Sequence, residues 1–174
     1  MHTIAPGMTN ADDMLALAAT RGDELAVPEM SARPSRRVAI LTCMDVRIDP
    51  ALLLGVERGE AHVIRNAGGL VTDDAIRSLS ASQRLLGSEE VVVVMHEGCG
   101  LCGASEDDFA RVLAADGSLP GWRLGAFDDV EAALRQGLER LRRSPELPHR
   151  EQIRGLVFDP RSGSLREART SGDA

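Results

Sequence analysis

The amino-acid sequence predicts a three-layer α/β/α fold, with a mostly parallel sheet of four strands plus an antiparallel edge strand. Short apolar runs alternate with amphipathic helical patterns along the chain, the order typical of parallel α/β sheets. The run at residues 91–95 contains four consecutive valines, as expected of a strand buried on both faces. The 174 residues suit one domain, in which we expect an N-terminal helix and arm (1–37), a core (38–169) and a frayed tail (170–174).

The individual elements follow from apolar periodicity and capping residues. Asn10 is a candidate N-cap for a first helix that runs to about residue 20 and stops at Gly22. Apolar runs predict strands at residues 38–43, 61–66, 91–95 and 153–158, with an edge strand at 165–168. Capping side chains and helical spacing predict further helices at residues 73–86, 106–115 and 128–143. The glycine-rich stretch 116–125 predicts a loop.

The composition excludes several classes of chemistry. The chain contains no lysine and no tyrosine, which rules out a Schiff-base lysine, a Walker-A lysine and a tyrosine nucleophile. A net charge of −7 and an aromatic content of 2% provide neither a basic face nor a stacking platform for nucleic acid. The apolar runs fall short of the ~20 residues of a membrane span, and a signal-peptide pattern is missing. We therefore expect a cytoplasmic protein without nucleic-acid or membrane partners.

The first candidate functional cluster follows the first strand directly. Cys43, Asp45 and Arg47 occupy alternate positions, so an extended chain would turn all three side chains to one side. The arginine fork could then hold the carboxylate through two hydrogen bonds and keep it ionised. The alternative interpretation is a buried cysteine, an aspartate that caps a helix and a surface arginine. These residues alone do not decide between the two.

The second cluster follows the valine-rich strand. His96 and Cys99 are separated by a short turn that contains Gly98, so both side chains could face one ion. Imidazole and thiolate are good zinc ligands, although a lone His-x-x-Cys is a weak signal. Both clusters lie at carboxyl ends of predicted parallel strands, where open α/β sheets place their sites. If the first and third strands are neighbours, Cys43 completes a three-ligand site with an open fourth position, which is the catalytic pattern.

The two clusters belong to a longer series of motifs. In chain order these are Cys43-x-Asp45-x-Arg47, Arg65-Asn66-Ala67-Gly68-Gly69, Thr72-Asp73-Asp74 and His96-x-x-Cys99-Gly100. This series resembles the β-class carbonic anhydrase family, in its short bacterial and archaeal form, over about residues 38–159. The resemblance implies a zinc lyase that reversibly hydrates CO2 to bicarbonate and a proton.

The resemblance also implies a role for each site residue. The implied ligands of the single Zn²⁺ are Cys43, His96 and Cys99. Asp45 would accept a hydrogen bond from the oxygen in the fourth position, and Arg47 would hold Asp45. In some family members the matching aspartate instead ligates zinc directly and closes the site. The backbone N–H of Gly100 would face the substrate.

The resemblance further implies a homodimer or a dimer of dimers, with the N-terminal helix crossing to the partner. Two other functions stay open at this point. Relatives with the same zinc ligands hydrolyse COS or CS2, the sulfur analogues of CO2. A non-catalytic zinc or redox-sensing module is the second alternative, with Cys102 as its only hint, and Arg47 counts against it because structural zinc needs no clamped carboxylate.

Two features depart from the family pattern or add to it. Glu97-Gly98 stands where the short branch often has Thr-Asp, and Glu97 either faces solvent or takes part in proton export. Cys102 forms a Cys-x-x-Cys pair with Cys99. We interpret Cys102 as a bystander thiol because Cys43 already completes the ligand set.

Overall fold

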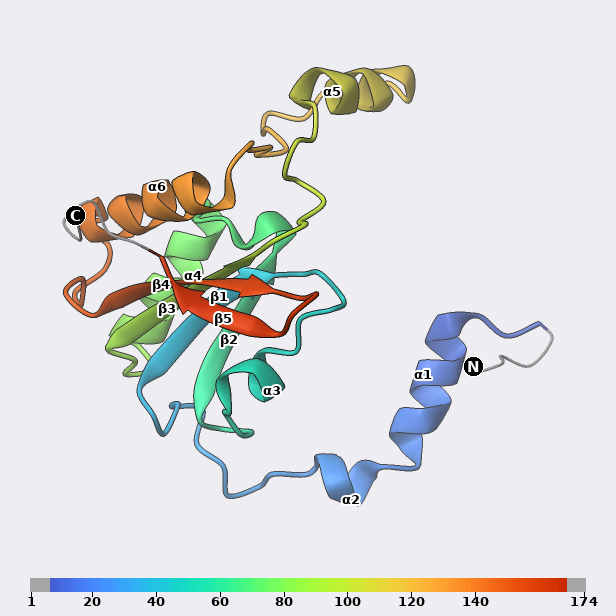
Figure 1. The fold of residues 1–174 in the computed structure, drawn as a ribbon. Helices are drawn as coiled ribbons and strands as arrows, with labels where there is room; N and C mark the ends of the chain where they lie inside the picture. The colour runs from blue at the N-terminus through green and yellow to red at the C-terminus, as the bar shows by residue number, and fades with distance from the viewer. Residues whose placement is uncertain (1–6, 169–174) are drawn as a thin grey trace. The chain divides into compact units, whose positions relative to one another are not determined.

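A computed structural model describes residues 7–168 of the chain (Figure 1). The chain divides into two compact units, Met1–Ser31 and Ala32–Ala174. The boundary between them lies within the arm expected at residues 1–37, and the tail expected at 170–174 lies outside the described residues. Within residues 7–168, none of the helices is long and apolar enough to cross a membrane.

The smaller unit contains two helices, α1 (Asn10–Ala19) and α2 (Gly22–Leu25). The N-cap of α1 is Thr9 rather than the expected Asn10, because Thr9 and Asp12 form a reciprocal capping box. Gly22 does separate the two helices, but it opens α2, a single turn that the sequence pattern did not predict. Neither helix has a buried residue, and the apolar side chains of Met14, Leu15 and Leu17 in α1 are exposed.

The larger unit is built on one five-stranded sheet. Its strands are β1 (Val38–Cys43), β2 (Ala61–Asn66), β3 (Glu90–His96), β4 (Ile153–Asp159) and β5 (Ser164–Glu167). The strand order is β2-β1-β3-β4-β5, with β5 antiparallel to β4 and all other pairs parallel. The α/β fold with four parallel strands and an antiparallel edge strand is confirmed. The order places β1 and β3 side by side, which is the condition for the two clusters to meet.

Two helices cover one face of this sheet and enclose the main core. Helix α4 (Asp73–Arg84) packs against β1 and β2, and helix α6 (Val130–Arg143) packs against β3 and β4. Inward-facing residues of the sheet and both helices are fully buried here, among them Leu41, Leu79, Val93, Leu134 and Leu141. A Cβ at Gly155 of β4 would lie 2.6 Å from Leu138 Cδ1, so this glycine permits the close approach of α6.

The opposite face of the sheet is covered in part by α3 (Pro50–Leu54), a short helix that the sequence pattern did not predict. Its N-cap is Asp49, whose carboxylate accepts hydrogen bonds from the amides of Ala51 and Leu52, and Pro50 occupies the first helical position. Beside α3 the sheet contributes apolar side chains to a cavity of about 360 Å³, lined by Val38, Ile40, Leu54, Val56, Val92 and Leu156 together with three charged residues.

The remaining helix, α5 (Glu106–Ala115), is capped by Ser105 as expected. The loop that follows is held by the Glu106 carboxylate, which accepts three backbone amides from residues 124–126. Helix α6 begins at Val130 behind an Asp129 cap, two residues later than expected, because a capping side chain defines the first turn more sharply than apolar spacing does.

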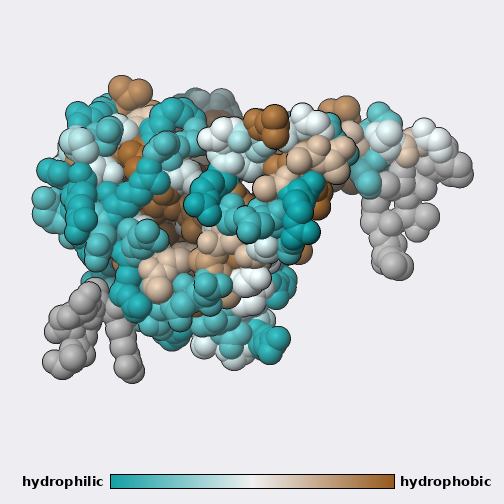
Figure 2. All heavy atoms as spheres, turned by 90° about the horizontal axis from the view of Figure 1, so that it is seen from above, coloured by the Kyte–Doolittle hydropathy of each residue, from teal (hydrophilic) through white to brown (hydrophobic). Residues whose placement is uncertain are grey.

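The surface view in Figure 2 shows mostly hydrophilic residues, with apolar residues exposed between them in a central hollow.

Candidate metal centre

The structure brings the two predicted clusters together at one edge of the sheet. Cys43 is the last residue of β1, and His96 is the last residue of the neighbouring strand β3. The register Thr42↔Val94 brings these strand ends to the same level, and the turn after β3 returns Cys99 toward them. The two sulfurs and an imidazole nitrogen lie within 4.8 Å of one another, and all three residues are buried. The three candidate ligands can therefore share one ion.

The imidazole of His96 is oriented for metal binding. Its Nδ1 lies 3.1 Å from the backbone oxygen of Glu97, to which it donates a hydrogen bond in the neutral tautomer. This arrangement leaves the lone pair of Nε2 free, and Nε2 is buried with no hydrogen-bond partner. A buried polar atom without a partner is costly, so its presence points to a group that the protein atoms do not supply. A zinc ion fits that position and the donor set.

The thiols lie in an apolar environment. Cys43, Cys99 and Ile48 form a small buried cluster. Partly buried apolar side chains pack against it, namely Leu53, Leu101, Phe127 and Phe158. In the metal-free chain, burial raises the pKa of the Cys99 thiol and lowers the pKa of His96. Two thiolates are therefore stable in this environment only when a cation neutralises them, which agrees with a soft-ligand zinc site.

Cys102 lies outside the three-ligand group. Its thiol is exposed, and its Sγ lies 3.5 Å from the backbone oxygen of Asp128. The backbone N–H of Cys102 donates to the Cys99 oxygen and closes a turn around Gly100. Gly100 is exposed within this turn, and the expected contact of its amide with substrate stays a prediction.

The carboxylate of Asp45 is clamped by Arg47. Arg47 donates from Nε to Asp45 Oδ1 at 2.9 Å and from Nη2 to Oδ2 at 2.7 Å, and its backbone amide adds a third bond. These hydrogen bonds hold the pKa of Asp45 well below its usual range. Asp45 Oδ2 lies 3.8 Å from His96 Nε2, so an ionised acceptor faces the space where the ligands converge.

Arg47 also joins the two ligand-bearing segments. Its Nη2 donates to the backbone oxygen of Gly98 at 2.9 Å. Gly98 lies between His96 and Cys99 and has a φ of +64°, a conformation that favours glycine and permits the tight turn. The side chain of Arg47 therefore connects the loop after β1 with the loop after β3.

The glycine pair after β2 lies directly against the site. Gly69 has a φ of +66°, and a Cβ there would lie 3.0 Å from the amide nitrogen of Cys43 and 3.1 Å from the Val94 oxygen. Only a residue without a side chain can approach the ends of β1 and β3 so closely. Gly69 is therefore a packing requirement of the metal centre.

The side chain of Glu97 takes part in an ion-pair network. Its carboxylate pairs with Arg166 of β5 at 3.0 Å, and Arg166 also pairs with Glu131 of α6. The side chain is half exposed and engaged in this ion-pair network. Glu97 thus points toward β5 and α6, which favours a surface role over proton export.

From its place in the Arg65-Asn66-Ala67-Gly68-Gly69 motif, Arg65 is interpreted as a residue that braces the loop around the site rather than a zinc ligand, and the structure gives the contacts by which it does so. Its guanidinium bonds the backbone oxygens of Cys43 and Asp45. The position of Arg65, directly before Asn66 and the glycine pair at the end of β2, was the only available signal. The carbonyls that it reaches depend on the strand order, which local sequence does not encode.

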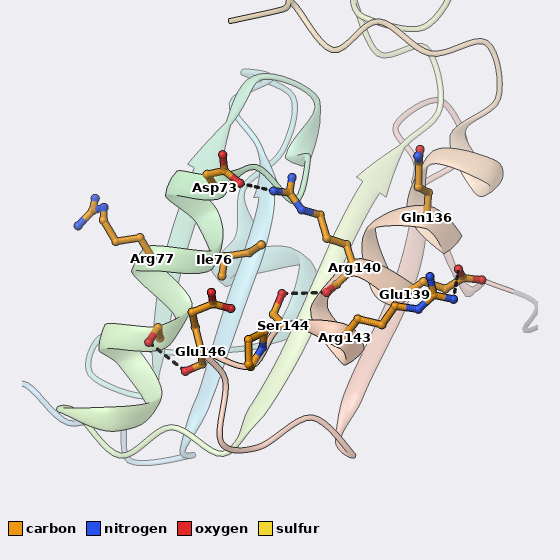
Figure 3. A pocket seen from close by; sticks show the side chains of 11 residues that line it. Asp73, Ile76, Arg77, Gln136, Glu139, Arg140, Arg143, Ser144 and Glu146 are labelled. Atoms are coloured by element: carbon orange, nitrogen blue, oxygen red, sulfur yellow. Dashed lines mark hydrogen bonds and ion pairs between the residues drawn. The ribbon is translucent and has the colours of Figure 1, made fainter.

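A large groove lies away from these residues. A groove of about 890 Å³ runs between α4 and the carboxyl-terminal end of α6 (Figure 3), and we call it the α4–α6 groove. Opposite charges pair within it: Asp73 with Arg140, and Glu139 with Arg143. These two pairs leave the groove without the buried, unpartnered nitrogen and the thiols that distinguish the candidate metal centre.

Comparison with known proteins agrees with this geometry. A sequence model of the family described as carbonic anhydrase matches residues 38–157. β-Carbonic anhydrase 1 of Mycobacterium tuberculosis is 42% identical over 161 residues, covering 92% of this chain and 98% of the relative. A carbon disulfide hydrolase of Acidithiobacillus thiooxidans is 34% identical, covering 79% of this chain and 80% of the relative.

Comparison with solved structures finds the same fold in carbonic anhydrases and a carbon disulfide hydrolase. The crystal structure of carbonic anhydrase from Streptococcus mutans superimposes with a TM-score of 0.85 at 35% identity, covering 93% of this chain and 99% of that one. The apo form of a carbon disulfide hydrolase superimposes with a TM-score of 0.71 at 29% identity, covering 91% of each chain. The matched segment contains every candidate ligand and the Asp45–Arg47 pair, and the chain belongs to the β-carbonic anhydrase family.

Proposed function

We propose that the protein catalyses the reversible hydration of CO2 to bicarbonate and a proton, with one zinc ion held by Cys43, His96 and Cys99. The observation that carries the proposal is the buried Nε2 of His96, which lacks a protein partner and faces two buried thiols. Zinc, when bound, supplies the Lewis acidity that makes water nucleophilic near neutral pH. Three protein ligands leave a fourth position for this chemistry.

Asp45 and Arg47 prepare the reacting water in this proposal. The Asp45 carboxylate is ionised and is held from two sides by Arg47. An ionised acceptor beside the ligands would accept the hydrogen of the attacking water and turn an oxygen lone pair toward the carbon of CO2. The bidentate pair supports an open resting arrangement, in which Asp45 binds Arg47 and leaves the fourth zinc position to substrate.

A carbon disulfide or COS hydrolase is the second candidate function, because relatives named carbon disulfide hydrolase match most of the chain. The higher identity to β-carbonic anhydrase 1 favours CO2. A stopped-flow CO2 hydration assay on protein with measured zinc content, run beside CS2 and COS hydrolysis assays, distinguishes them. Zinc-loaded protein that hydrates CO2 faster than it hydrolyses either sulfur analogue supports the proposal. Zinc-loaded protein that leaves CO2 unreacted would overturn it.

We also propose that the protein acts as a homodimer. Val46 is 97% exposed and Met44 is 65% exposed, so the two residues on either side of Asp45 carry uncovered apolar side chains. The apolar residues Met14 and Leu15 of α1 are likewise exposed. Light scattering should give twice the mass of one chain, and Leu15→Glu should shift the protein toward a monomer. A wild-type monomer at micromolar concentration contradicts this.

A cytoplasmic location is part of the proposal. The three cysteines are free, and a thiolate-rich zinc site is suited to a reducing compartment. Fractionation of the source cells, with the protein detected by antibody, tests the location directly.

A further inference from the structure

Arg65 makes a two-pronged contact with the segment that carries two of the proposed site residues. Its Nε donates to the backbone oxygen of Cys43 at 3.0 Å, and its Nη2 donates to the backbone oxygen of Asp45 at 2.8 Å. Both bonds have ordinary lengths for an N–H···O hydrogen bond. The guanidinium therefore spans the main chain on both sides of Met44.

This contact begins where the sheet stops supporting the chain. The ladder between β1 and β3 ends at Thr42↔Val94, and the ladder between β1 and β2 ends at Cys43↔Asn66. One further backbone bond joins the amide of Met44 to the oxygen of Asn66 at 2.9 Å. Beyond Met44, the bond from Arg65 to the Asp45 oxygen continues the restraint from β2, and the amide of Ile48 donates to the same oxygen within the loop. The orientation of Asp45 depends on this segment, because its side chain projects from it.

Arg47 and Arg65 hold different parts of the same residue. Arg47 binds the Asp45 carboxylate and the Gly98 oxygen, whereas Arg65 binds the Asp45 backbone oxygen. The side chain of Asp45 can be aimed only if its backbone is also fixed. Arg47 thus ties the Asp45 carboxylate to the loop after β3, whereas Arg65 ties the Asp45 backbone to β2.

We propose that Arg65 is a positioning residue, which holds the Cys43–Asp45 backbone so that the thiol and the carboxylate keep their spacing around the zinc ion. The inference rests on the proposed function for its catalytic part and on the ligand geometry alone for its metal-binding part. Residues that orient metal ligands from outside typically contribute about 10- to 100-fold to metal affinity or activity. A small displacement of an orienting group lowers the rate by a comparable factor.

The geometry also indicates why arginine is required. Two nitrogens on one edge of a planar fork reach two carbonyl oxygens two residues apart. A lysine ammonium keeps the positive charge, but it concentrates its donors on one nitrogen atom. Arg65→Lys therefore separates the effect of charge from that of the two-pronged contact.

The chain offers a matched control in Arg84 at the end of α4. Its Nε donates to the backbone oxygen of Glu146 at 2.7 Å, and its Nη2 donates to that of Pro145 at 3.4 Å. Arg84 and Arg65 are both exposed, and both bridge two carbonyls of a loop. Arg84 holds the loop after α6 and contacts none of the candidate ligands. The Arg84→Gln variant therefore shows how much stability is lost when an exposed arginine no longer bridges two loop carbonyls.

The test compares Arg65→Gln, Arg65→Lys and Arg84→Gln with the wild-type protein. Zinc release to a chelator, the urea midpoint, and kcat and KM for CO2 hydration are measured for each. We expect Arg65→Gln to release zinc about 10-fold more readily or to lose about 10- to 100-fold in kcat, with KM little changed. Arg65→Lys should recover only part of the loss. Arg84→Gln should stay within about twofold of wild type in zinc release and kcat, whatever its urea midpoint.

Each result decides the proposal. Equal zinc release and kcat in Arg65→Gln and Arg84→Gln would overturn it, even if both variants unfold at lower urea. Full recovery by Arg65→Lys would also overturn it, because charge alone would then suffice. If Arg65→Gln does not fold, zinc release and kcat are compared between Arg65→Lys and Arg84→Gln instead. If the zinc-loaded wild type hydrates no CO2, the proposed function fails, while zinc release still decides whether Arg65 positions the ligands.

Discussion

The metal centre and the α4–α6 groove are both places where polar side chains from separate elements approach one another. The groove has a volume of about 890 Å³ and is lined by several charged residues. Its central charges are paired, since Arg140 pairs with Asp73 and also donates to the Val71 oxygen. At the metal centre a buried imidazole nitrogen has no partner and lies beside two buried thiols.

This difference teaches where chemistry is to be sought in a fold of this kind. Paired charges at a surface are solvated and contribute little, so their number says little about function. An unpaired buried nitrogen carries a cost that only a missing group can remove. An unpaired buried polar atom should therefore be a better guide to the active site than paired surface charges. Substitutions that remove a zinc ligand from the metal centre, or break an ion pair in the groove, test this.

The largest effect is expected from removing a ligand. Cys43→Ser replaces a thiolate by a hydroxyl that binds zinc poorly, so zinc content and CO2 hydration should both fall to background. Arg140→Gln breaks the central ion pair of the groove and is the matched control. We expect it to keep full zinc content and a kcat/KM within about twofold of wild type. Zinc analysis and stopped-flow hydration on both variants measure this, and a zinc-replete Cys43→Ser would contradict the ligand assignment.

The next largest effect is expected from Asp45→Asn. The amide keeps the size of the side chain but loses its charge and one acceptor, so Arg47 can no longer bind it through two acceptor oxygens. Zinc should be retained, while kcat/KM should fall by about 10²-fold, because the attacking water loses its orienting acceptor. Wild-type turnover by zinc-loaded Asp45→Asn would refute the role given to this residue.

A smaller, graded effect is expected from pH. In the metal-free chain the pKa of Cys99 is raised by burial, so the thiol is protonated at neutral pH and zinc must displace its proton. Zinc affinity should therefore rise with pH, by about tenfold per unit for each thiol deprotonated, and level off above the thiol pKa. The pKa of His96 is lowered by burial, so this ring is neutral near pH 7 and competes with zinc only at acid pH.

Competition with a chelator of known zinc affinity at several pH values measures this dependence. An affinity that stays constant between neutral and alkaline pH would mean that the thiols do not ligate as thiolates. The Arg140→Gln variant of the groove should reproduce the wild-type curve, because it changes no group at the centre.

Much of the fold followed from sequence because its strands carry strong local signals. Val91–Val94 and the run that ends at Cys43 contain no polar alternation, and parallel strands end at a common edge. Convergence of Cys43 with His96 and Cys99 could be predicted for that reason. Helix α3 was missed because it has five residues, too few for apolar periodicity to register. The pair Asp49-Pro50, an N-cap followed by a first-position proline, was the signal that could have found it.

The remaining contacts depend on chain segments far apart in sequence. Glu97 meets Arg166, 69 residues later, and Arg65 reaches carbonyls that only the strand order brings near it. The N-cap of α1 was misplaced by one residue for a local reason. Thr9 and Asn10 are both good caps, and each has an aspartate three residues later, so the local pattern does not decide between them. In the structure the Thr9 amide donates to the Asp12 carboxylate.

The smallest effect is expected from Cys102→Ser, which tests whether proximity in sequence suffices to make a ligand. Cys102 lies three residues after Cys99, yet its thiol is exposed and faces the Asp128 oxygen. Serine keeps a hydroxyl donor for that oxygen, so zinc content and kcat/KM should stay within about twofold of wild type. Zinc loss in Cys102→Ser, with zinc retained in Cys43→Ser, would move the third ligand to residue 102. The zinc ligands would then be His96, Cys99 and Cys102, and the unpaired Nε2 of His96 would share the ion with the Cys102 thiol instead of the Cys43 thiol.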